Sequence, residues 1–154
     1  MKLKVAISYA LGGKSAPVTL RAEDDAVVMT LANDDGPWRV ALDADPSIRL
    51  LLDLDEAMTK PVRGATTLDY LDGFEVVVTW SSEGESHRVA GRCPSHQSHP
   101  VLASVLTAIA TALLTTSEPV AITTARSLLE HIGPDEPESL ATNSVSAART
   151  DRSG

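Results

Sequence analysis

The chain has 154 residues, a length that fits one domain better than two. Its net charge of −8 repels phosphate backbones and anionic lipid, so nucleic acid and membranes are poor candidate partners. Hydrophobic residues make up 43% of the chain but aromatic residues only 3%, so Val, Leu, Ile and Ala must form the core.

The amino-terminal segment predicts a strand rather than a targeting signal. Lys2 and Lys4 alternate with Leu3, Val5 and Ile7, which is the period of a half-buried strand. The apolar stretch is short, and no small-x-small cleavage site follows it cleanly. We therefore expect a protein that is not exported.

The same alternation, or a run of β-branched and aromatic residues, marks five further segments. Turn-forming residues separate them, above all Asn33-Asp34-Asp35-Gly36-Pro37 and the hairpin turn Ser82-Glu83-Gly84-Glu85. The six expected strands cover residues 2–11, 17–22, 26–32, 38–42, 74–81 and 86–93.

A short helix is expected within this series of strands, over residues 47–58. Its apolar residues fall close to helical spacing, and Asp45 precedes Pro46 as a plausible cap. Leu50, Leu52 and Leu54 also alternate, so a strand remains an alternative. Residues 62–72 then form a connection.

Two consecutive helices are expected after the strands, over 99–116 and 118–132. Ser98 is a good amino-terminal cap for the first, with Pro100 in its first turn. The body of this helix carries no charged residue, so it is buried or packs against another subunit. It is too short and too rich in Thr to span a bilayer.

Residues 134–154 carry no aromatic residue and few large aliphatic ones, so we expect a disordered tail. Residues 1–133 then form one α+β domain. We expect an antiparallel meander of about six strands with one short inserted helix, followed by two carboxy-terminal helices packed on one face.

The histidines and the cysteine suggest a candidate metal site. Three of the four histidines and the single cysteine lie close together in the sequence, and such side chains suit Zn²⁺. The spacing matches no standard zinc pattern, and a polar loop before a helix accounts for the residues better. The candidate ligands are His87, Cys93, His96 and His99.

Three further patterns are weaker. Cys93 lies a few residues before a predicted helix and near histidines, so it is a candidate nucleophile, although no family signature surrounds it. Gly13-Lys14-Ser15 lacks both the earlier glycine and the following helix of a phosphate-binding loop. The pairs Asp43/Asp45 and Asp53/Asp55 fit solvated carboxylates better than a magnesium site.

We expect a non-catalytic protein-binding domain that uses an acidic sheet surface, or an exposed part of the helix at 99–116, to hold another protein, with a basic protein as the candidate partner. The single cysteine favours a reducing, cytoplasmic location. A metal- or thiol-dependent enzyme at the Cys93 loop, and a structural subunit that assembles through the helix at 99–116, remain alternatives. The candidate partner-binding residues are Asp34, Asp35, Asp43 and Asp45.

Overall fold

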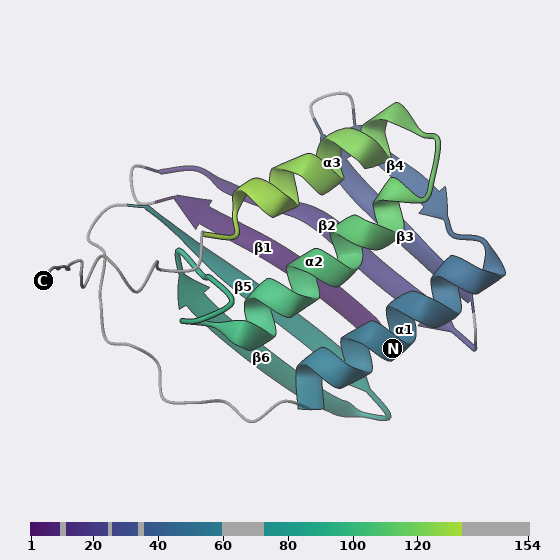
Figure 1. Ribbon diagram of the computed structural model, residues 1–154, viewed down its shortest axis with the longest axis horizontal. Helices are drawn as coiled ribbons and strands as arrows, with labels where there is room; N and C mark the ends of the chain where they lie inside the picture. The colour runs from purple at the N-terminus through teal and green to yellow at the C-terminus, as the bar shows by residue number, and fades with distance from the viewer. Residues whose placement is uncertain (10–11, 25, 34–35, 60–72, 134–154) are drawn as a thin grey trace, which may run out of the picture.

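The computed structural model describes residues 1–9, 12–24, 26–33, 36–59 and 73–133. The expected connection at 62–72 and the expected tail at 134–154 lie outside these residues. Six strands and three helices follow one another along the chain (Figure 1). They are β1 (Lys2–Tyr9), β2 (Lys14–Glu23), β3 (Ala26–Asn33), β4 (Gly36–Ala41), α1 (Ala44–Thr59), β5 (Phe74–Ser82), β6 (Glu85–Arg92), α2 (Pro100–Leu114) and α3 (Pro119–Glu130).

The strands form one antiparallel sheet in the order β4-β3-β2-β1-β5-β6. The α+β class and the run of six strands expected from the sequence are therefore confirmed. Strands β1 to β4 form a meander, and β5 then returns to the free side of β1. As a result β1 lies inside the sheet, and β4 and β6 lie at its edges.

All three helices cover the same face of the sheet, with α2 between α1 and α3 (Figure 1). The core is aliphatic, as the composition requires, and lies between the helix layer and the inward residues of the strands. The strand side chains that point into this core include Leu3, Val5, Ile7, Val18, Leu20, Met29, Leu31, Val76 and Val78.

The uncharged helix α2 is buried within the chain. Val105 and Ile109 are fully inaccessible, whereas Thr111 and Leu114 are exposed near the end of the helix. The first of the two explanations for its composition, burial, is confirmed. A charge at Val105 or Ile109 would therefore test the stability of the fold and not an interface.

The helix starts differ from expectation in detail. Asp45 lies inside the first turn of α1, which begins at Ala44, so the cap predicted there is wrong. Ser98 is not the cap of α2 either. That position belongs to His99, and no side chain caps the helix. Proline opens both α2 and α3, as expected from its fixed φ angle.

One buried hydroxyl holds the start of α1 against the sheet. The Ser47 side chain accepts a hydrogen bond from the backbone N–H of Val27 in β3 (3.2 Å) and donates one to the backbone oxygen of Leu42 (3.3 Å). Ser47 is fully buried, so these bonds replace the water that the polar groups lose.

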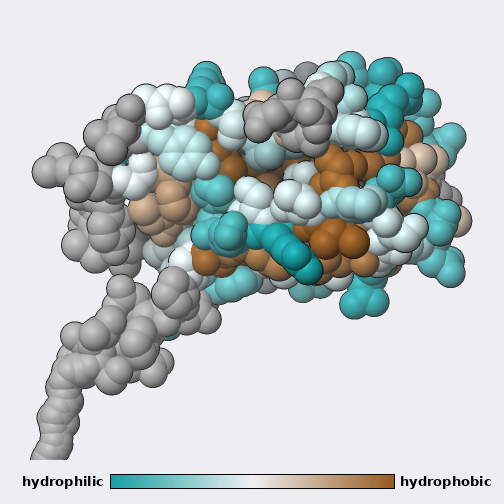
Figure 2. All heavy atoms as spheres, turned by 90° about the horizontal axis from the view of Figure 1, so that it is seen from above, coloured by the Kyte–Doolittle hydropathy of each residue, from teal (hydrophilic) through white to brown (hydrophobic). Residues whose placement is uncertain are grey.

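The surface on the α3 side has no single apolar face. Figure 2 looks at the molecule from that side and shows hydrophobic patches separated by hydrophilic side chains. Leu114 and Leu129 are among the exposed large hydrophobic residues. Scattered residues of this kind are normal on a monomeric surface, so the distribution of charge is the better guide to a site.

Candidate functional site

The face of the sheet that no helix covers carries most of the exposed basic side chains of the strands. Successive side chains of a strand point to opposite faces, so the neighbours of the core residues point away from the helices. We call this surface the open face. Its basic residues are Lys2 and Lys4 in β1, Lys14 and Arg21 in β2, Arg39 in β4, and Arg88 and Arg92 in β6.

Strand register aligns three of these cations in one line across the sheet. Thr30 pairs with Arg39 and with Thr19, Thr19 pairs with Lys4, and Lys4 pairs with Thr79, which pairs with Arg88. Neighbouring strands are about 4.8 Å apart, so Arg39 lies about 14 Å from Lys4, and Lys4 about 10 Å from Arg88, measured across the strands. We call this line the cationic row: Arg39, Thr30, Thr19, Lys4, Thr79 and Arg88.

The next line of the open face places two like charges opposite each other. Lys2 pairs directly with Arg21 across β1 and β2. Such a pair destabilises a sheet unless a negative charge lies nearby. Glu23 forms an ion pair with Arg21 at 3.4 Å, but both side chains are well exposed and the pair contributes little. Among the described strand residues, the carboxylates of this face are Glu23 and Glu75.

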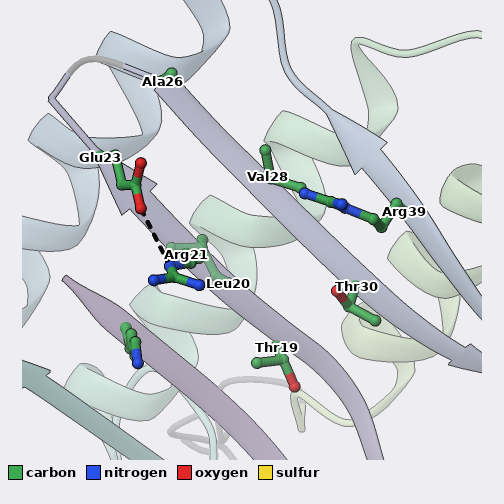
Figure 3. Close-up of a pocket in the computed structure, with 9 residues that line it drawn as sticks. Thr19, Leu20, Arg21, Glu23, Ala26, Val28, Thr30 and Arg39 are labelled. Carbon is green, nitrogen blue, oxygen red and sulfur yellow. Dashed lines mark ion pairs between the residues drawn. The ribbon is translucent and has the colours of Figure 1, made fainter.

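Two adjoining hollows lie on the open face and share Lys2 and Thr19. The larger, of about 620 Å³, is shown in Figure 3, where Arg39 extends from β4 across β3 towards Val28 and the Arg21–Glu23 pair lies on the other side. The second, of about 410 Å³, includes Lys4 and Arg88. Together they span the sheet from β4 to β6, with small side chains on the floor and cations around it.

The chemistry of the open face is that of anion binding. Arginine and lysine supply positive charge and several N–H donors, and the threonine hydroxyls between them add further donors. Carboxylates accept such hydrogen bonds, and charge-assisted bonds are the stronger ones. The arrangement therefore suits a surface that carries several carboxylates spaced like the cations of the sheet.

Most acidic residues lie away from the open face, so this face is not the acidic sheet surface that we expected. Asp43 and Asp45 are exposed at the start of α1. Asp34 and Asp35 lie outside the described residues. Most other carboxylates of the described chain belong to α1 and to turns, whereas the open face carries more basic than acidic side chains.

The four expected metal ligands are not brought together. His87 is on β6 and stacks on Trp80, with ring centroids 5.3 Å apart. His96 is exposed, and Cys93 lies 4.0 Å from the backbone oxygen of Phe74. Within the described parts of the chain, no three His, Cys, Asp or Glu side chains come close enough to hold a metal ion. The zinc and thiol alternatives therefore stay predictions for which this geometry supplies no ligand set.

His99 instead belongs to a small polar network beside α2. Its Nδ1 atom lies 2.9 Å from the Ser98 hydroxyl, which lies 3.0 Å from the Ser95 hydroxyl. The ring packs so closely on Gly91 of β6 that a Cβ atom at that position would clash with it. Burial of the ring lowers the pKa of His99 below its usual value. These contacts give His99 a packing role between β6 and α2.

Comparison with known proteins found no matching protein family, no similar curated protein and no similar solved structure. The site must therefore be interpreted from its own chemistry. None of the described helices is both long enough and apolar enough to cross a membrane.

The polar positions of the strands are rich in lysine and arginine, and this predicts a basic sheet face even though the net charge of the chain is negative. The alternation that predicts the strands also assigns Lys2, Lys4, Arg21, Arg39 and Arg88 to the polar side of each strand. Collecting those polar positions would have shown a basic face. The alignment of the cations into one row depends on strand order and register, which the sequence does not state.

Proposed function

We propose that this protein is a non-catalytic protein-binding domain whose binding surface is the open face, and that this face holds an acidic protein surface. The observation that carries the proposal is the concentration of exposed cations across the hollowed open face of a chain whose net charge is −8. Electrostatic complementarity of this kind steers partners and sets register.

A protein partner fits this face better than a nucleic acid does. Single-stranded nucleic acid is usually held by aromatic side chains on which the bases stack. Strand register places the aromatic residues of the described strands on the helix side of the sheet: Tyr9, Trp38, Phe74 and Trp80. Phe74 and Trp80 also pack against the core. We place the protein in the cytoplasm, where its single cysteine would stay reduced.

The proposal is tested with poly-L-glutamate as a defined acidic probe, measured by isothermal titration calorimetry. The open-face variant carries Lys4→Glu with Arg39→Glu, two exposed positions in the cationic row. The control is Arg126→Glu, an exposed arginine on α3 in the helix layer. We expect binding by the wild type and the control at about 0.1 M salt, and at least about a tenfold loss in the open-face variant.

A second titration, with oligo-dT of similar charge, distinguishes the two classes of anion. Binding of poly-L-glutamate that is equal in the wild type and the open-face variant would refute the assignment of the surface. Tighter binding of oligo-dT than of poly-L-glutamate would refute the assignment of a protein partner.

A further inference from the structure

The outer side of α1 is complementary to the open face, because it carries acidic side chains where the open face carries basic ones. One side of this helix faces the core and carries its buried residues, which are Ser47, Leu50, Leu54 and Ala57. On the opposite side, Ile48 and Leu52 are 41% and 63% exposed. Large apolar residues at this spacing form one stripe of a helix surface, and nothing in the described chain covers this stripe.

Carboxylates surround this apolar pair. Asp45 and Asp55 lie three residues to either side of it, and Glu56 lies one turn beyond Leu52. All three are exposed. Arg49, the basic residue of the helix, is already in an ion pair with Asp53 at 3.4 Å. We call the set Asp45, Ile48, Leu52, Asp55 and Glu56 the α1 knob: two apolar side chains inside a ring of carboxylates.

The larger hollow of the open face has the opposite pattern. Ala26 and Val28 form an apolar floor on β3, with Arg39 on one side and the Arg21–Glu23 ion pair on the other (Figure 3). Lys2 also lines this hollow, so its cations outnumber its one carboxylate. An apolar pair surrounded by carboxylates can bury its methyl groups on this floor while its carboxylates meet the cations. Glu23 is already paired with Arg21, so a carboxylate of the partner would relieve the repulsion between Lys2 and Arg21 best from beside Lys2.

We propose that the open face takes the α1 knob of a second copy of this chain. The inference rests on the proposed function, because it names the acidic protein surface that the open face holds. α1 lies in the helix layer on the other side of the sheet, so a molecule cannot place its own knob on its own open face (Figure 1). The contact joins two different surfaces, and copies therefore associate head to tail.

The strength of this association should depend on the salt concentration. Each copy carries a net charge of −8, which opposes approach at long range, whereas the proposed contact joins opposite charges at short range. The screening length is about 10 Å at 0.1 M salt and about 3 Å at 1 M salt. Moderate salt therefore screens the overall repulsion more than the contact itself, and high salt weakens the contact too.

The test is sedimentation velocity on the full chain as a function of concentration, with two charge-reversal variants. For this test the open-face variant is Lys2→Glu with Arg39→Glu, two residues that line the larger hollow. The knob variant is Asp55→Lys with Glu56→Lys. We expect the wild type to associate in proportion to its concentration at about 0.1 M salt, with an apparent dissociation constant at least about tenfold higher at about 1 M salt. Each variant alone should remain monomeric.

Mixing the variants gives the decisive result. The open-face variant keeps an intact knob and the knob variant keeps an intact open face, so the mixture should form a one-to-one dimer that grows no further. A chain that carries both reversals should associate again, because its charges are exchanged but still complementary. Arg126→Glu should associate like the wild type.

Failure of this inference can be told apart from failure of the proposed function. A wild type that stays monomeric at every concentration, but binds poly-L-glutamate through the open face, overturns the second copy as the occupant and leaves the function standing. A wild type that neither associates nor binds the probe overturns both. Association that the reversals do not change overturns the assigned surfaces.

Discussion

Replacing Ser47 by alanine removes only one hydroxyl group, but it should destabilise the protein by more than so small a change suggests. The hydroxyl of Ser47 bridges the backbone N–H of Val27 and the backbone oxygen of Leu42 inside the core. An alanine would leave that N–H buried without its acceptor, because a methyl group cannot replace the oxygen. A buried polar group that loses its partner costs about 1–3 kcal/mol, so we expect a loss of about 2 kcal/mol in the free energy of unfolding.

For a chain of this length, that loss should lower Tm by about 4 to 8 °C. The assay is thermal unfolding followed by circular dichroism, with urea unfolding to give the free energy directly. Ser117→Ala, at an exposed position, is the control and should change Tm by less than about 2 °C. A Ser47→Ala variant as stable as the control would show that Ser47 does not anchor α1 on β3.

Three further predictions concern the interface between the sheet and the helices. Because burial lowers the pKa of His99, the unfolded chain takes up its proton more readily, so Tm should fall as pH drops below about 6.5, and His99→Gln should reduce this slope. Gly91→Ala should cost about 1–3 kcal/mol, because the added methyl group meets the His99 ring, and a double-mutant cycle with His99→Ala should show coupling between the two positions. Tyr9→Phe removes the 2.8 Å hydrogen bond to His131 at an exposed site, so urea unfolding should show a loss of only about 0.5–1.5 kcal/mol.

Local patterns are sufficient to predict the elements of this fold. The alternation around Val5 and the turn residues at Ser82-Glu83-Gly84-Glu85 act within a few positions of the chain, and signals of this kind predict all six strands. The pairing of β5 with β1 has no such signal. It joins segments that lie far apart along the chain, and only the packing of the whole core selects it.

The candidate site could not be predicted from the sequence for the same reason. Proximity along the chain suggests a cluster of His87, Cys93, His96 and His99, but a strand and a loop turn these side chains in different directions. The cations of the open face lie far apart along the chain and meet only through register. The net charge of −8 conceals them, because a sum over the chain says nothing about separation between faces.

The most direct test of the open face is an amide chemical-shift map of the ¹⁵N-labelled chain titrated with poly-L-glutamate at about 0.1 M salt, where charged contacts are still only partly screened. We predict that the largest shifts fall on the cationic row, at residues such as Lys4, Thr19 and Thr30, and that they vanish in the Lys4→Glu, Arg39→Glu variant. Shifts concentrated on α2 and α3, or an unchanged map in that variant, would contradict the claim that the open face is the binding surface.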